Sequence, residues 1–299
     1  GLAALADARG RFAVLAMDQR ATLRRMLTAA GRSPTTAAMR AFKVDVVAAL
    51  APLSSGVLLD NDFGVPAVLA AAALPAGVGL LIAAEPPDKA RWHGEYRTVV
   101  DPQRSAAWVR AHGGDALKFL LYWDPDRAAG PGEPDLAEEA MAAVRSVVED
   151  CAATGVPSVI EPLIAFRPGA EVSPQQRYES VVRSAARLAA LRPSLLKLEW
   201  PGSAQGCRRV SDALGEVPWT LLSAGVAYAE FLDRCRTALD NGASGVIAGR
   251  AIWQEAVEVD DDRRPDFLRE VSVPRLAALV DIVREHGRSW RDVAGSVAS

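Results

Sequence analysis

The chain has 299 residues and a formal net charge of −3; half of its residues are hydrophobic and 24% are charged. These values are typical of a soluble globular protein, and the mild acidity argues against nucleic acid as the main partner, because binding of a phosphate backbone needs a basic face. The three cysteines, Cys151, Cys207 and Cys235, are widely spaced and form no CxxC pair, so we expect no disulfide framework and no structural zinc, in a reducing compartment.

Two apolar segments have some features of targeting or membrane-spanning sequences. The run Phe12–Met17 is too short to cross a membrane and leads directly into Asp18, so it predicts no signal peptide. The segment Val65–Ala84 is nearly all apolar over about the length of a spanning helix, but a proline and two glycines divide it into a helix, a turn and a strand. We therefore expect a cytoplasmic protein without a membrane segment.

Short apolar runs rich in Val, Leu and Ile recur along the chain and alternate with amphipathic segments. Parallel strands that are buried on both faces have this continuous apolar character. The eight predicted strands are Phe12–Met17, Gly56–Asp60, Gly79–Ala84, Ala116–Tyr122, Pro157–Leu163, Ser194–Trp200, Trp219–Ala224 and Gly245–Gly249. Eight such units predict an α/β fold, a (β/α)8 TIM barrel. An open doubly wound sheet is the alternative, but no early strand is followed by its G-x-G-x-x-G turn.

The segments between and after the strands fit a single domain. Asp135–Ala153 has an acidic start and apolar spacing, which predicts an amphipathic surface helix. After the eighth strand, the acidic stretch Asp260–Asp262 interrupts the pattern, and Val273–His286 predicts a last helix that closes or decorates the barrel. We expect residues 1–299 to form one barrel domain, with residues 259–299 as a C-terminal helical extension.

Two of the four lysines interrupt apolar strand-like runs, although 30 of the 34 basic residues are arginine. Lysine can lose its proton where arginine cannot, and burial can lower its pKa by several units. Lys118 and Lys197 lie on the fourth and sixth predicted strands, and alternate strands of a barrel contribute to the same layer of side chains. A protonated Lys118 would lower the pKa of Lys197 and make it a nucleophile. The alternative for Lys118 is an outward position beside Asp115.

Carboxylates follow several predicted strands, at the end of a barrel where catalytic groups collect. They are Asp18, Asp60, Glu85 and Glu161. Glu161 is the predicted proton shuttle, because its apolar flank would raise its pKa toward neutrality; the alternative is an ion pair with Lys118 or Arg167. Glu199 lies two residues beyond Lys197 and could neutralise a lysine.

The last two predicted strands are followed by glycine-containing turns, Leu222–Val226 and Ala248–Ala251. This is the usual phosphate position of (β/α)8 enzymes, where backbone N–H groups meet the anion. Gly225 and Gly249 would let the backbone approach closely, while Ser223 could donate a hydroxyl and Arg250 a bidentate contact. The alternative is that the glycines merely allow tight turns.

Six segments together resemble one family. They are Phe12–Arg20, Ala116–Lys118, Ile160–Pro162, Leu196–Glu199, Leu222–Gly225 and Gly242–Arg250. From about Phe12 to Glu285 the chain resembles the class I aldolases that include tagatose-1,6-bisphosphate and sulfofructose-1-phosphate aldolases. The resemblance implies cleavage of a small-molecule sugar phosphate to dihydroxyacetone phosphate, without a metal or other cofactor, by a homo-oligomer.

The same resemblance implies a role for each matching residue. Lys197 would be the Schiff-base lysine, Glu161 the acid/base and Lys118 its charged neighbour. Asp18 and Gln19 would hold substrate hydroxyls. Ser223, Gly225, Gly249 and Arg250 would bind the 1-phosphate. Candidates for the anion at the far end of the substrate are Arg20, Lys89, Arg91, His93, Arg97 and Arg167.

Within the family, two segments point to different substrates. Val271–Val283 is more similar to the sulfofructose phosphate enzymes, which implies cleavage of 6-deoxy-6-sulfofructose 1-phosphate to dihydroxyacetone phosphate and sulfolactaldehyde. Leu120–Asp126 is closer to the tagatose type, which implies tagatose 1,6-bisphosphate as the alternative substrate and glyceraldehyde 3-phosphate as the product. Of the two, we expect 6-deoxy-6-sulfofructose 1-phosphate to be the substrate.

Other functions remain as alternatives. A zinc-dependent class II aldolase would need a histidine-rich ligand set, and the three histidines, His93, His112 and His286, follow no predicted strand end in a convincing way. A barrel lyase or isomerase could use Lys197 as an electrostatic group without forming an imine. A non-catalytic sugar-phosphate sensor could use the same scaffold.

Overall fold

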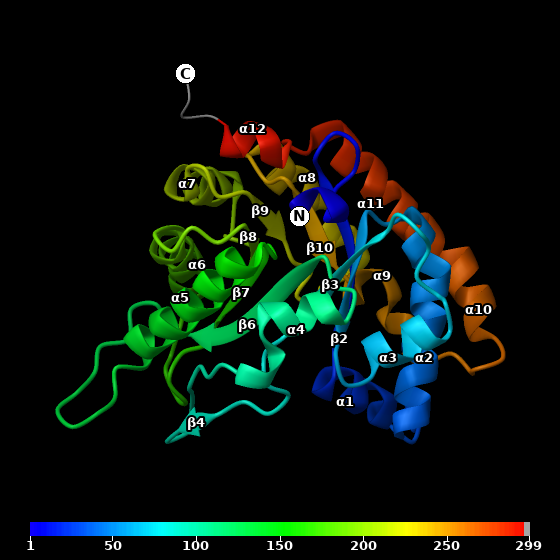
Figure 1. The fold of residues 1–299 in the computed structure, drawn as a ribbon, viewed down its shortest axis with the longest axis horizontal. Coiled ribbons are helices and arrows are strands. Elements are labelled where there is room, and N and C mark those ends of the chain that lie inside the picture. Colours follow the sequence, from blue (N-terminus) through cyan, green and yellow to red (C-terminus); the bar gives the residue numbers. More distant parts are fainter. Residues whose placement is uncertain (296–299) are drawn as a thin grey trace.

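The computed structural model describes residues 1–295, in which eight parallel strands form a closed barrel surrounded by helices (Figure 1). The strands are β1 (Phe12–Met17), β2 (Gly56–Asp60), β3 (Gly79–Ala83), β6 (Ala116–Trp123), β7 (Ser158–Ile164), β8 (Leu195–Leu198), β9 (Trp219–Leu221) and β10 (Gly245–Ala248). Their order around the barrel is β1-β10-β9-β8-β7-β6-β3-β2. The predicted (β/α)8 barrel is confirmed, and all eight predicted strands are present.

Helices cover the outside of the barrel. They are α1 (Ala21–Ala29), α2 (Thr36–Leu50), α3 (Gly64–Ala70), α4 (Ala106–Ala111), α5 (Leu136–Thr154), α6 (Pro174–Ala189), α7 (Ala204–Leu214), α8 (Tyr228–Asp240), α9 (Arg250–Trp253), α10 (Arg264–Phe267), α11 (Val273–His286) and α12 (Trp290–Ala294). The apolar run Val65–Ala84 contains most of α3, a turn and β3, as expected. In residues 1–295 no helix has the length and apolar character that crossing a membrane requires.

Side chains alternate along each strand between the inside of the barrel and the layer beneath the helices. On β1, Phe12 and Val14 belong to a small inner cluster, whereas Ala13 and Leu15 belong to the large cluster between strands and helices. Leu195 of β8 also belongs to the inner cluster. Because the side-chain period of a strand is two, this alternation directs residues two positions beyond Ala116 and Leu195 into the barrel.

The C-terminal segment contributes a helix to the outer ring. Helix α9 has only four residues, and α11 packs against β1, α2 and α8. The predicted helix Val273–His286 therefore closes the ring of helices. Beyond it, α12 lies beside the N-terminal 3-10 helix (Leu2–Leu5) at the amino end of the strands, where Trp290 N–H donates to the carbonyl of Gly10 (Figure 1).

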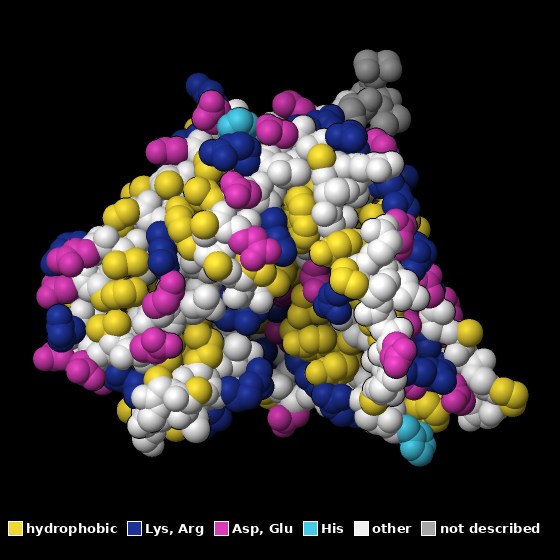
Figure 2. Space-filling view, turned by 180° about the vertical axis from the view of Figure 1, so that it is seen from behind, with side chains coloured by type: hydrophobic (Ala, Val, Ile, Leu, Met, Phe, Trp, Pro, Cys, Tyr) yellow, Lys and Arg dark blue, Asp and Glu magenta, His cyan; other side chains and the backbone are white. Residues whose placement is uncertain are grey.

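A two-stranded hairpin that was not predicted lies between β3 and α4. It consists of β4 (Arg91–Trp92) and β5 (Glu95–Tyr96). Tyr96 stacks on Tyr122 of β6 with 4.3 Å between ring centroids, and Glu95 accepts a 2.8 Å hydrogen bond from Arg127. These contacts hold the hairpin against the carboxyl end of β6. On the face in Figure 2, positive and negative side chains are interspersed with hydrophobic ones.

Candidate active site

A cavity of about 280 Å³ lies at the carboxyl ends of the barrel strands. Its polar lining residues include most of the predicted site residues: Asp18, Gln19, Arg20, Glu161, Lys118, Lys197, Ser223 and Arg250. Gly249 also lines it, whereas Gly225 lies beside it, next to Arg250. Thr22, Arg25, Glu85, Lys89, Tyr96 and Tyr122 complete the polar part of the wall.

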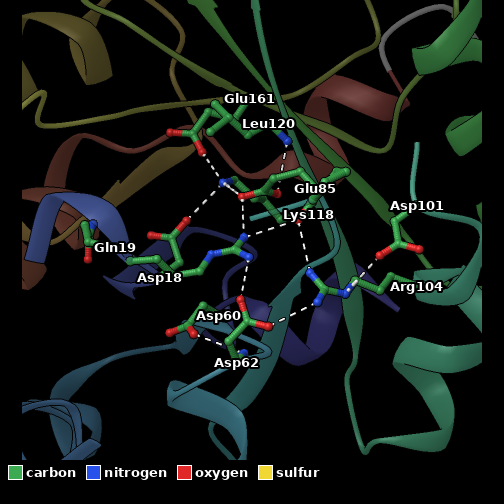
Figure 3. Close-up of polar contacts among 12 residues, drawn as sticks. Asp18, Gln19, Asp60, Asp62, Glu85, Asp101, Arg104, Lys118, Leu120 and Glu161 are labelled. Atoms are coloured by element: carbon green, nitrogen blue, oxygen red, sulfur yellow. Dashed lines mark hydrogen bonds and ion pairs between the residues drawn. The ribbon is translucent and has the colours of Figure 1, made fainter. Parts of the chain in front are cut away.

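Lys118 lies at the centre of a buried cluster of charges (Figure 3). Its side chain is 1% exposed, and its Nζ lies 3.0 Å from Asp18 Oδ2, 3.1 Å from Glu85 Oε1 and 2.8 Å from Glu161 Oε2. The inward position predicted for Lys118 is confirmed; Asp115 accepts a hydrogen bond from Leu80 N–H instead. Burial opposes the charged amine, but the three carboxylates outweigh it and raise the pKa of Lys118 well above its ordinary value.

Glu161 joins the two buried lysines. Its Oε1 lies 2.8 Å from Nζ of Lys197, while its Oε2 lies 2.8 Å from Nζ of Lys118. Burial alone would raise the pKa of Glu161, but the two positive charges outweigh it and hold the pKa below its usual value. The predicted elevated pKa is therefore wrong, because the apolar flank of the strand is not what the carboxylate contacts. Of the two alternatives, the ion pair with Lys118 is present.

Asp18 and Glu85 complete the carboxylates around Lys118. Burial favours the neutral form of Asp18, but the charges of Lys118 and Lys197 dominate and hold its pKa well below the usual range. Glu85 follows β3, contacts Lys118 with Oε1 and accepts a 3.2 Å hydrogen bond from Leu120 N–H with Oε2. The sequence identified Glu85 as a strand-end carboxylate but assigned it no role. Its position two residues beyond the inward-facing Ala83 is the signal that could have done so.

Asp60 does not reach the cavity, although it was one of the predicted strand-end carboxylates. It forms a fully buried ion pair with Lys43 of α2, with 2.7 Å between Oδ2 and Nζ. Lys43 also donates to the carbonyls of Met17 and Gln19 at 2.7 and 2.9 Å. The pair therefore fixes the backbone on both sides of Asp18. Sequence analysis missed Lys43, whose only signal was its rarity as a lysine in an arginine-rich chain.

Arg20 lines the cavity and belongs to a chain of ion pairs. Its guanidinium lies 2.8 Å from Asp62 Oδ2 and 3.3 Å from Glu85 Oε1, and it donates to the carbonyl of Glu85. Arg104 extends the chain with contacts to Asp62 and Asp101 at 3.1 and 3.2 Å. The positive charge of Arg20 is thus largely compensated within the protein.

Gln19 and Asn61 hold buried amide atoms without partners among the described residues. For Gln19 this atom is Oε1, and the residue lines the cavity. A buried acceptor without a donor is costly, so a substrate hydroxyl would fit there. For Asn61, both Oδ1 and Nδ2 are unpaired; we have no physical account of this.

Two predicted carboxylate contacts are absent in residues 1–295. Glu199 does not neutralise Lys197: β8 ends at Leu198, and Glu199 accepts hydrogen bonds from Arg177 and from Ile164 N–H. The alternation of the strand therefore no longer applies to it. Arg167 does not pair with Glu161 but lies 2.7 Å from Glu133.

The turns after β9 and β10 surround a cationic end of the cavity. Arg250 lines this end and forms no ion pair or hydrogen bond with the described residues. Gly225 has a φ of +82°, and a β carbon there would lie 2.7 Å from Nη1 of Arg250. Ser223 is buried and lines the same end. The guanidinium of Arg250 is uncompensated by the described residues, and the adjacent turn has room only for glycine. This combination is suited to binding a small anion.

Gly249 is required by close packing. A β carbon at this position would lie 2.0 Å from the carbonyl oxygen of Ala16 and 2.9 Å from Nε1 of Trp253. We expect Gly249→Ala to lower the free energy of unfolding by about 1–3 kcal/mol, the usual cost of overpacking, and to displace the end of β1 that carries Asp18. Urea denaturation measures the change. Gly295→Ala, whose nearest contact would be 3.3 Å away, is the control; equal stability of the two variants would contradict the prediction.

The six candidates for the far-end anion divide into two groups. Arg20 and Lys89 line the cavity, whereas Arg91, His93, Arg97 and Arg167 do not. Arg91 lies over the ring of Tyr96 and donates to Gly94, and Arg97 pairs with Glu139. His93 is exposed in the turn of the hairpin. The cavity also includes Arg25 of α1, which the sequence analysis did not consider.

The arrangement has the parts that imine chemistry requires. A primary amine, Lys197, is 4% exposed at the base of an open cavity and touches a carboxylate that can accept or return a proton. A second cation lies on the far side of that carboxylate. In residues 1–295 there is no group of three or more His, Cys, Asp or Glu side chains placed to hold a metal ion.

Known proteins are similar to this chain in sequence or in fold. A description of the DeoC/LacD family of aldolases matches residues 12–255. Tagatose 1,6-diphosphate aldolase 2 of Streptococcus agalactiae serotype III (strain NEM316) is 29% identical over 326 aligned positions, covering 96% of this chain and 95% of that one. Tagatose 1,6-diphosphate aldolase of Listeria monocytogenes serotype 4a (strain HCC23) is 29% identical over 330, covering 99% and 94%.

Among solved structures, an archaeal fructose 1,6-bisphosphate aldolase superposes with a TM-score of 0.66 at 17% identity, covering 94% of this chain and 96% of that one. Another, described with its catalytic Lys covalently bound to the carbinolamine intermediate of the substrate, gives 0.64 at 16%, covering 93% and 96%. At this identity the likeness concerns the fold.

The barrel and the family match together define an enzyme of the lyase class. The chain belongs to the DeoC/LacD family of aldolases. The predicted aldolase resemblance is confirmed at this level.

Proposed function

We propose that this aldolase is a class I enzyme that cleaves a ketose 1-phosphate to dihydroxyacetone phosphate and an aldehyde through an imine on Lys197. The observation that carries the proposal is the contact of Lys197 with Glu161, which Lys118 holds from its other side. A nucleophilic lysine needs a neighbouring group to take its proton, and Glu161 is within hydrogen-bond distance.

The residues present can perform each step. Lys197 Nζ attacks the C2 carbonyl of the ketose, and loss of water gives a protonated imine. A base removes the proton of the C4 hydroxyl, the C3–C4 bond breaks, and the aldehyde leaves while the electron pair is stored as an enamine. Protonation of C3 and hydrolysis of the imine release dihydroxyacetone phosphate and restore Lys197. Glu161 is the proposed acid/base; Asp18 and Gln19 are placed to hold substrate hydroxyls.

Both candidate substrates carry a 1-phosphate and a second anion on C6. Leu120 and Tyr122, from the segment of tagatose type, line the cavity, whereas Val271–Val283, which resembles the sulfofructose phosphate enzymes, lies in the outer helices. The relatives at 29% identity are also named for tagatose 1,6-diphosphate. These observations favour tagatose 1,6-bisphosphate, and 6-deoxy-6-sulfofructose 1-phosphate is the second candidate.

We expect borohydride reduction in the presence of dihydroxyacetone phosphate to inactivate the enzyme and to leave one adduct, which peptide mass mapping places on Lys197. Retro-aldol assays with tagatose 1,6-bisphosphate, 6-deoxy-6-sulfofructose 1-phosphate and fructose 1,6-bisphosphate then rank the substrates. Turnover without an adduct would indicate a lyase or isomerase that uses Lys197 only as a charge. Ligand-dependent stabilisation without turnover would indicate a sensor.

A further inference from the structure

We propose that Lys89 binds the anionic group at the far end of the ketose and so selects substrates that carry a second anion. The inference rests on the proposed cleavage of a ketose 1-phosphate at Lys197 and concerns the part of the substrate that leaves as the aldehyde. Lys89 lies in the loop between β3 and the β4–β5 hairpin, and it lines the catalytic cavity.

The order of the strands gives the substrate a direction. Lys197 is on β8, and the cationic end at Arg250 follows β10, two strands away in one direction. A ketose with C2 at Lys197 and its phosphate at Arg250 extends its remaining carbons the other way, past Glu161 on β7 and along β6 to the end of β3. Lys89 lies six residues beyond β3, on the side of the cavity that the C6 group reaches.

Lys89 is also a cation whose charge no carboxylate of residues 1–295 compensates through an ion pair. Arg20 is compensated by Asp62 and Glu85. The Nζ of Lys89 donates to the carbonyl of Pro86 at 2.9 Å and forms no ion pair with a carboxylate of residues 1–295. An ammonium has three donors, so two remain for an anion. Lys89 also lines a second, small pocket together with Tyr96 and Tyr122, whose rings are stacked.

The titration of Lys89 falls in an accessible pH range. Burial lowers its pKa to about 8, with contributions from the positive charges of Lys118 and Arg20 and opposition from Glu85 and Glu161. The remaining titratable neighbours are Asp88, Tyr96, Arg97 and Tyr122. An anion binds the protonated form of Lys89. The affinity of the site for the anion is therefore highest below pH 8 and falls as the pH rises above this value.

We expect Lys89→Met to raise KM for tagatose 1,6-bisphosphate by about 10- to 100-fold, the usual worth of a hydrogen bond to a charged group. KM for tagatose 1-phosphate, which lacks the far-end anion, should change less than about twofold. In the wild type, KM for the bisphosphate should rise above about pH 8, and KM for the 1-phosphate should not rise in the same way.

Two further variants control the measurement. Lys89→Arg keeps a permanent cation, so it should retain most of the preference for the bisphosphate and lose the rise in KM above pH 8. Arg91→Met removes a nearby charge at the start of β4 that does not line the cavity, and it should leave the ratio of the two KM values unchanged.

An equal effect of Lys89→Met on both substrates, or no effect on either, would overturn the assignment while leaving the cleavage reaction intact. The absence of any cleavage of ketose phosphates by the wild type would instead reject the proposed function on which the assignment rests.

Discussion

Replacement of Lys197 by Arg should abolish aldol cleavage, with kcat/KM falling by at least about 10⁴-fold, because a guanidinium cannot form an imine. The variant keeps a positive charge next to Glu161, whose Oε1 lies 2.8 Å from Nζ in the wild type. Loss of turnover would therefore result from the loss of the nucleophile, because the positive charge is still present. A coupled assay for dihydroxyacetone phosphate measures the loss of cleavage, and borohydride trapping of the same sample measures the loss of the imine.

Lys197→Met provides the comparison, because it removes both the nucleophile and the charge. We expect the same loss of turnover in both variants and a lower melting temperature only for Met, since Glu161 then keeps Lys118 as its single cation. If Lys197→Arg retained cleavage within about tenfold of the wild type, the imine mechanism would be wrong and an electrostatic role for Lys197 would take its place.

Replacement of Lys118 by Met should cause the largest loss of stability, about 3–5 kcal/mol at neutral pH, because it leaves Asp18, Glu85 and Glu161 without their shared cation. Lys118 holds the pKa values of Asp18 and Glu161 low in the folded protein. That stabilisation is present above the pKa of an unfolded carboxyl, about 4, and is lost as the pH falls through the folded value. The difference between wild type and variant should therefore be nearly constant between pH 7 and about 5 and shrink as the pH is lowered through 4 and below.

Urea denaturation at several pH values measures this effect. Lys89→Met is the matched control, since the same substitution there removes a half-buried amine without a carboxylate partner. It should change the free energy of unfolding by about 1 kcal/mol or less at any pH in the range. A loss of stability in Lys118→Met that stays constant with pH would mean that the carboxylates are not its cause.

The strands and the central lysines were predictable because they depend on local patterns. Period-two alternation, read from the apolar runs, placed Lys118 and Lys197 inside the barrel and made Glu161 a plausible neighbour. The same rule misplaced Glu199, because β8 ends one residue earlier at Leu198 and the chain then turns toward Arg177. The apolar pattern of a strand does not indicate the residue at which its backbone pairing with the neighbouring strands ends.

The electrostatics were not predictable, because they depend on how many charges meet in space. The pKa of Glu161 is lowered by two ammonium groups from two different strands, and no single strand shows both. The Lys43–Asp60 pair links a helix to a strand end, and the β4–β5 hairpin has strands of only two residues. Association of the barrel into a homo-oligomer stays a prediction.

The loop that leads from β3 to the β4–β5 hairpin can accept sequence changes that the barrel strands cannot. The proposed reacting groups Lys197, Glu161 and Lys118 are on strands whose replacement would disturb the barrel itself. Lys89 instead lies in the loop of residues 86–90, beyond Glu85, which can vary in length and sequence without altering a strand or the contact of Glu85 with Lys118. Relatives could thus acquire a preference for another aldehyde by exchanging this one loop, while the chemistry of bond cleavage is inherited unchanged.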